Sequence, residues 1–370
     1  MFESVTQPDQ QVTYSAPTKR KKKTENAKSL EEYKRTKPSA IKALEYLASE
    51  NKDYSNTIEL FDFIPKYVWG KEERVNDQYL PTIKREFECR GIRYKAIIAP
   101  ASIEEKDGKF RDYYPGRREE IIEAALRKLA CDGHGEFLDD LAGVVFSLNE
   151  LQTELKDMGH TYSIAEIKES LMICVKTIIE IKTEDGQEVL VSGIFETLRL
   201  RTWNDWQEKG QQTRGFVRFN FLVTDSIKSG AFRRFNYTKF MSYRSVITRQ
   251  LYKRLSHHYI QASLANTYEI LLSTMIRDFG LTACKRLKDN LREVEIALKE
   301  LETDNIILNF KIEKMIESCG QNKLTDAKII IRPHPYFASE MIKANERHKQ
   351  VKVLLTISPH NSKGESVPTN

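Results

Sequence analysis

The segment from Arg214 to Ile260 reads RGFVRFNFLVTDSIKSGAFRRFNYTKFMSYRSVITRQLYKRLSHHYI and interleaves aromatic with basic residues. Its ten lysines and arginines against the single acid Asp225 give it a charge of +9, which exceeds the +6 of the whole chain, so the remainder is net acidic. Ten phenylalanines and tyrosines are too many for a solvated linker. We therefore expect a folded segment that presents positive charge, and nucleic acid is the commonest partner of such a surface.

The whole chain has the composition of a globular protein with more than one domain. It has 370 residues, of which 40% are hydrophobic and 30% are charged, and one hydrophobic core does not usually serve that length. No apolar run is long enough to span a membrane, and the N-terminus lacks the pattern of a signal peptide. The five widely spaced cysteines fit reduced thiols that pack in the interior: Cys89, Cys131, Cys174, Cys284 and Cys319. We expect a cytoplasmic protein that is not bound to membranes.

The first 37 residues are predicted to form a disordered basic arm. They contain few large aliphatic residues, and Lys19 to Lys23 form a run of like charge. Such a run is equally typical of a flexible arm that lies on the phosphate backbone and of a solubilising tail.

A winged helix is predicted at about residues 117–200, within an N-terminal domain that covers 38–206. Three stretches of helical periodicity follow one another, and the last two open with S-x-x-E capping boxes, at Ser147 to Glu150 and Ser163 to Glu166. Two β-branched runs then flank Glu184-Asp185-Gly186, which favours a hairpin. Helix, helix, turn, helix and two-stranded wing is the order of a winged-helix domain.

This first winged helix carries the wrong charge for DNA. Between Glu136 and Trp206 there are 14 acids and 6 bases, a balance of −8, which repels phosphate in most orientations. Its third helix contributes only Lys168 and Lys176 as cations. We expect it to pack against protein, most simply in a homodimer, while specific base reading is the alternative.

A second winged-helix domain is predicted at 214–337, after a polar connection from Trp203 to Thr213. The expected elements are a strand at 216–223, an extended piece at 232–237, a helix from Tyr243, a strand at 268–272, a short helix capped by Ser273, a long helix at 285–303, and strands at 306–312 and 328–331. Residues 338–370 are expected to form a last helix and a disordered tail. The fold class is therefore α+β, with two tandem winged helices between two tails.

The long helix at 285–303 is the candidate recognition helix. Its first turns carry four cations while its glutamates lie further along, and a recognition helix enters the major groove by its N-terminal part. The alternative is an ordinary surface helix stabilised by charge pairs. The residues predicted to contact DNA are Arg218, Arg233, Arg234, Lys239, Arg244, Arg249, Lys253, Lys285, Arg286, Lys288, Arg292 and Lys311.

The sequence contains no pattern for a catalytic, metal or cofactor site. There is no Gly-rich phosphate loop, which makes a nucleotide-driven motor improbable. Cys131 and His134 have no second pair at ligand spacing. The adjacent His257 and His258, which precede Tyr259, cannot both point the same way from a helix. We expect a non-enzymatic protein without metal or cofactor.

The tandem arrangement, with a basic aromatic strand and helix leading into the second winged helix, resembles the replication initiators of iteron-carrying plasmids. The residues that carry this resemblance are Phe235, Tyr237, Lys239, Ser242, Tyr243, Ser245, Arg249, Leu251 and Tyr252. The spacing between Tyr243 and Leu251 is longer than the family pattern, and Gln250 interrupts it.

The resemblance implies a protein that binds repeated double-stranded sites at a plasmid origin, distorts the DNA and recruits host helicase or initiator proteins. It further implies that the second winged helix makes the main groove contacts and that the first holds inactive dimers. A winged-helix transcriptional regulator without initiator activity requires the same DNA-reading surface, so the sequence does not separate the two functions. A DNA-processing enzyme with an unrecognised active site also stays open.

Overall fold

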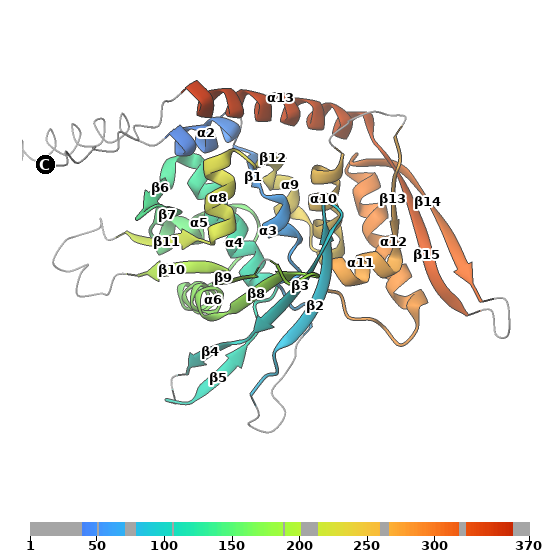
Figure 1. Ribbon diagram of the computed structural model, residues 1–370, viewed down its shortest axis with the longest axis horizontal. Helices are drawn as coiled ribbons and strands as arrows, with labels where there is room; N and C mark the ends of the chain where they lie inside the picture. The colour runs from blue at the N-terminus through green and yellow to red at the C-terminus, as the bar shows by residue number, and fades with distance from the viewer. Residues whose placement is uncertain are drawn as a thin grey trace, which may run out of the picture. The chain divides into compact units, whose positions relative to one another are not determined.

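The computed structural model describes residues 39–49, 52–70, 79–105, 107–187, 189–200, 214–259, 266–317 and 323–357 (Figure 1). The expected basic arm, the connection from Trp203 to Thr213, Cys319 and the final dozen residues lie outside this described part. Within it, none of the helices is long and apolar enough to cross a membrane.

The elements before residue 117 support both winged helices. They are α2 (Ser39–Ala48), β1 (Tyr54–Thr57), α3 (Glu59–Phe63), β2 (Ile83–Cys89), β3 (Ile92–Ala99), β4 (Ala101–Glu104) and β5 (Phe110–Tyr113). Strand β1 pairs with β12, and the β2–β3 hairpin extends the wing of the first winged helix into a four-stranded sheet of order β2-β3-β8-β9. The sequence assigned these elements to no motif, because each finds its partner far along the chain.

The first winged helix forms where the sequence predicted it. Its elements are α4 (Arg117–Leu129), a short π-helical turn (Ala130–His134), β6 (Gly135–Leu138), β7 (Leu141–Phe146), α5 (Leu148–Asp157), α6 (Ile164–Lys176), β8 (Ile178–Thr183) and β9 (Val189–Gly193). Both capping boxes are confirmed: the Ser147 and Ser163 hydroxyls accept hydrogen bonds from the backbone N–H groups of Glu150 and Glu166.

One strand crosses the expected domain boundary. β11 (Gly215–Phe219) pairs with β7 and with β10 (Phe195–Arg199), so it completes a sheet of the first winged helix and does not begin the second domain. The strand expected at 216–223 also ends early. The side-chain oxygen of Asn220 accepts a hydrogen bond from the backbone N–H of Leu222 and caps a helix, α8 (Phe221–Ser229).

The second winged helix follows the predicted order. After β12 (Arg233–Asn236) and α9 (Tyr237–Ser242), its elements are α10 (Val246–His258), β13 (Tyr268–Leu271), α11 (Leu272–Asp278), α12 (Leu287–Thr303), β14 (Ile307–Ile316) and β15 (Leu324–Pro333), with strand order β13-β15-β14. The prediction that Ser273 caps α11 is wrong. Its hydroxyl donates to Asp326 at 2.5 Å, and it lies inside the helix.

The last helix, α13 (Pro335–Ile357), returns to the first one. It packs along α2 and β12, as Figure 1 shows. The hydroxyl of Tyr46 donates to Gln350 at 2.9 Å, and the guanidinium of Arg347 lies 4.4 Å from the centre of the Tyr46 ring. The C-terminal helix therefore joins the end of the second winged helix to the N-terminal part of the chain.

Candidate nucleic-acid interface

The turn that leads into α12 is held from inside the fold. Asn290, which is buried, accepts a hydrogen bond from the backbone N–H of Cys284 at 2.8 Å and donates to the carbonyl of Thr282 at 3.0 Å. On the other side, the indole N–H of Trp69 donates to the carbonyl of Phe279 at 2.6 Å. These bonds fix the direction in which α12 leaves the turn.

The start of α12 presents the cations that the sequence predicted for it. Leu291, Val294 and Leu298 are buried, and Lys288 and Arg292 are exposed in the first turns of α12. Lys285 and Arg286 are exposed just before the helix, which begins at Leu287 and not at Lys285 as expected. Arg286 pairs with Asp289 at 3.1 Å, whereas the other three make no ion pair with any described residue. Unpaired cations at the start of a recognition helix can meet phosphates or the acceptor atoms of guanine.

The wing beside α12 is also basic, although some of its charge is neutralised. Lys311 pairs with Glu313 at 2.7 Å, and Lys328 pairs with Glu269 at 2.6 Å. Lys314 and Lys323 are exposed on the same hairpin. Exposed ion pairs of this kind are weak, so a phosphate can displace the carboxylate from Lys311.

Three of the predicted DNA contacts are corrected, because Arg234, Arg249 and Lys253 are buried. The side chain of Arg249 is 1% exposed, and its Nε donates to Glu120 at 2.9 Å. Lys253 lies 3.4 Å from Asp62, and Arg234 stacks over the ring of Tyr54 at 4.0 Å. A nearby cation of the same segment, Arg254, is also buried and pairs with Asp278 at 2.8 Å. Much of the positive charge of this segment is therefore neutralised inside the molecule.

The carboxylate of Asp62 is the centre of this interior network. Arg127 of α4 lies 2.7 Å from it and Lys253 of α10 lies 3.4 Å from it, so one acid joins the first helices of the two winged helices. Burial opposes the ionisation of Asp62, but Arg127 and Lys253 outweigh it and hold the pKa of that carboxyl well below its usual range. Lys66, buried nearby, has its pKa lowered by burial to about 8.

Four residues predicted to contact DNA remain: Arg218, Arg233, Lys239 and Arg244. Arg218 pairs with Asp139, Arg233 donates to Asn345 at 2.6 Å, and Lys239 donates to the carbonyl of Asp304 at 3.3 Å. Burial also lowers the pKa of Arg233. Only Arg244 of this group is exposed. The structure therefore gathers Lys285, Arg286, Lys288, Arg292 and Lys311 on the second winged helix and sets Arg244 apart.

Both adjacent histidines are engaged by other side chains, but only His257 is buried and His258 is exposed. The ring of His257 lies 2.7 Å from the hydroxyl of Thr57, and that of His258 stacks between Phe63 and Tyr268 at centroid distances of 5.4 and 5.6 Å. Desolvation lowers the pKa of both, to about 4 for His258. Across the described ranges, no group of three or more His, Cys, Asp or Glu side chains is placed to hold a metal ion.

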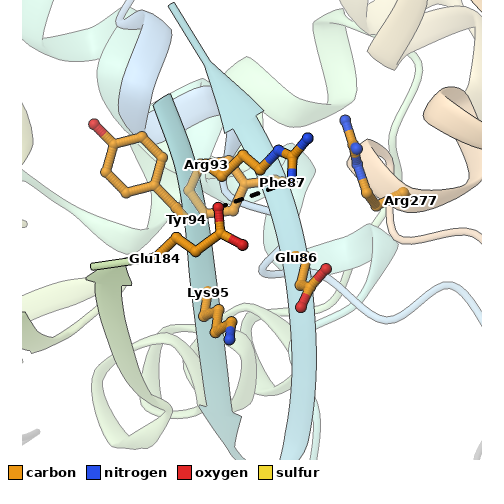
Figure 2. A pocket seen from close by; sticks show the side chains of 7 residues that line it. All are labelled: Glu86, Phe87, Arg93, Tyr94, Lys95, Glu184 and Arg277. Atoms are coloured by element: carbon orange, nitrogen blue, oxygen red, sulfur yellow. Dashed lines mark ion pairs between the residues drawn. The ribbon is translucent and has the colours of Figure 1, made fainter. Parts of the chain in front are cut away.

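A small polar pocket joins the two winged helices, and the sequence did not indicate it. Figure 2 shows Arg93 on the β2–β3 hairpin facing Glu184 at 3.8 Å, with Arg277 of α11 on the other side. The pocket encloses about 200 Å³, and its other lining residues are Glu86, Phe87, Tyr94 and Lys95. Its charges are mixed, so it is not built for an anion. No local pattern could have predicted it, because Arg93 and Arg277 are distant in sequence.

The fold and this surface define the class of protein: two winged helices in one chain, of which the second exposes basic residues at the start of its long helix α12. No protein-family model matches the sequence, and no curated protein matches it. Among solved structures, the chain is similar to two crystal structures of domains 2 and 3 of RctB. Both have a TM-score of 0.44 and 11% identity; one covers 70% of this chain and 94% of that chain, the other 76% and 99%.

The chain is also similar to the Pi initiator protein, whose structure is in complex with iteron DNA. That comparison has a TM-score of 0.38 and 14% identity and covers 59% of this chain and 96% of that chain. At such identities, no residue role is transferred from those proteins to this chain.

Proposed function

We propose that this protein is a sequence-specific, double-stranded DNA-binding replication initiator that binds repeated sites at a plasmid origin. The observation that carries the proposal is the start of α12, where Lys285, Lys288 and Arg292 are exposed and make no ion pair with the described residues. Charges that no carboxylate of the described residues neutralises are available to a polyanion. They are the groups that a recognition helix needs at its N-terminal end.

The basic wing adds contacts to the phosphate backbone on either side of that helix. Lys314 and Lys323 are exposed there, and Lys311 is held only by an exposed ion pair. Several copies on successive repeats would share the cost of bending the origin, which is of order 1–6 kcal/mol for a smooth bend. The protein acts without nucleotide, metal or cofactor and is not an enzyme. It works in the bacterial cytoplasm and recruits host helicase or initiator proteins.

The first winged helix serves protein contacts in this proposal. Part of its candidate recognition helix α6 is already engaged: the amino group of Lys176 donates to the carbonyl of Ser102 on β4 at 3.0 Å, and Glu169 pairs with Arg118. These contacts within the chain disfavour direct base reading by α6, and the homodimer rests on the acidic balance of the first winged helix. A winged-helix regulator without initiator activity would use the same α12 surface and is the second candidate.

The decisive experiment uses the full chain, because a fragment that begins at Arg214 would leave Arg249 and Lys253 without Glu120 and Asp62. Duplexes are selected from a random library, and their affinity is measured against salt. Lys288→Ala should weaken binding, and it should lower the slope of log K against log salt by about 0.9 if Lys288 meets a phosphate. Lys349→Ala, at an exposed position on α13, is the control and should leave both quantities unchanged.

The outcome of selection decides between the candidates in two steps. If no duplex is enriched at low salt, DNA binding itself is refuted. If a site is enriched, the gene and its flanking DNA are placed on a replicon without an origin. Maintenance of that replicon supports the initiator, whereas loss of the replicon with repression of a flanking promoter favours the regulator. Sedimentation of the full chain at micromolar concentration tests the dimer, and a strict monomer would contradict it.

A further inference from the structure

One large apolar side chain lies on the charged outer face of α12. Ile296 is 57% exposed. It follows Lys288 and Arg292 at intervals of four residues, so the three side chains form one line along the helix. The line is turned away from the buried residues Val294 and Leu298. From Lys288 to Ile296 the helix rises by roughly 12 Å, which is about the width of the major groove.

The surroundings of Ile296 argue against a protein partner. Its neighbours one turn away on the helix surface are Arg292, Glu293, Lys299 and Glu300, all of them charged. A docking surface for protein is centred on a cluster of apolar or aromatic residues that lack charge. A single isoleucine among charges, in line with two groove-facing cations, is better suited to a small apolar target. In the major groove that target is the C5 methyl group of thymine.

We propose that Ile296 is a specificity-determining residue that contacts the C5 methyl group of a thymine in the recognised site. The inference rests on the proposed function, since it requires α12 to lie in the major groove. Lys288 and Arg292 hold the helix by charge, and Ile296 distinguishes thymine from cytosine, which lacks that methyl group. Ile296 lies one turn further from the N-terminal end of α12 than Arg292.

The test replaces each thymine of the selected duplex in turn by deoxyuridine, which removes only the methyl group. With the full-length wild-type chain, the change should weaken binding about fourfold at one position, the effect expected for one buried methyl-sized group. Ile296→Ala should weaken binding to the unmodified duplex by a similar factor. It should also be insensitive to deoxyuridine at that same position. Alanine has the highest helix propensity, so this variant keeps α12 intact.

Val353→Ala is the matched control, because it removes an exposed β-branched side chain (55% exposed) from α13. It should retain the full sensitivity to deoxyuridine. The inference is overturned if no thymine position responds in the wild type, or if Ile296→Ala responds to deoxyuridine as the wild type does. If no duplex is selected at all, the proposed function fails and this inference fails with it.

Discussion

Arg249→Met tests whether the central basic helix α10 is part of the core or part of a DNA surface. Arg249 and Glu120 have side-chain exposures of 1% and 0%. Methionine retains the length of the side chain but leaves the carboxylate of Glu120 buried without Arg249, while the side-chain amide of Gln250 still donates to it at 2.8 Å. Removing one partner of a buried ion pair costs about 3–5 kcal/mol. That is a large part of the 5–15 kcal/mol by which a typical protein is stable.

Two measurements are made on this variant. Unfolding in urea is monitored by circular dichroism, and DNA binding is measured as a function of salt concentration without urea. The free energy of unfolding should fall by about 3–5 kcal/mol, whereas the salt slope of DNA binding should not change. Met substituted at both positions, 120 and 249, should recover most of the lost stability, because an apolar pair of similar volume often replaces a buried ion pair without cost. Arg244→Met, at an exposed position two residues before the start of α10, should change the stability by less than about 0.5 kcal/mol.

The opposite pattern would refute this reasoning. If Arg249→Met unfolds at the wild-type urea concentration and lowers the salt slope by about one ion, the arginine faces DNA and the buried pair is not formed in solution. If the double variant is as unstable as the single one, the loss comes from poor packing of methionine and not from the unpaired carboxylate of Glu120.

Three further predictions concern stability. Because the folded-state pKa of His258 is about 4, the unfolded chain binds the extra proton between about pH 6.5 and 4. Wild type should therefore lose stability relative to His258→Gln as pH falls through that window, by an amount that the solvent exposure of the side chain reduces, and a pH-independent difference would contradict the lowered pKa. Lys66 has a folded-state pKa of about 8, so between about pH 8 and 10.5 the unfolded chain binds more protons than the folded one. As pH rises through this range, wild type should gain stability relative to Lys66→Met. A difference in the free energy of urea unfolding that does not change with pH would exclude a buried amine. Gly280 has a φ of +62°, and an added Cβ would lie 2.6 Å from Arg85, so Gly280→Ala should lower the free energy of unfolding by at least about 1–2 kcal/mol. Gly70→Ala is the control, because a Cβ at Gly70 meets open space, and it should be nearly neutral. Equal losses of stability in the two variants would refute the role of this turn.

Local signals in the sequence were sufficient for the parts of the fold that depend on neighbouring residues. The capping boxes at Ser147 and Ser163 depend on atoms three residues apart, so their sequence pattern predicted the starts of α5 and α6. In α12 the apolar stripe fixes which face is buried, and the exposure of Lys288 and Arg292 follows from that register. The candidate interface on the second winged helix could therefore be predicted without a structure.

Other features depend on residues that are far apart in the chain. The sequence shows that Arg249 and Lys253 are cations, but it does not show that Glu120 and Asp62 lie against them. It predicts a strand from residue 216, but not that the partners of this strand are β7 and β10 from the preceding domain. An isolated cation in a sequence favours the surface, because burying an unpaired charge is costly. Only the tertiary structure brings the compensating carboxylate to it, and so decides which charges of the basic segment remain outside for a partner.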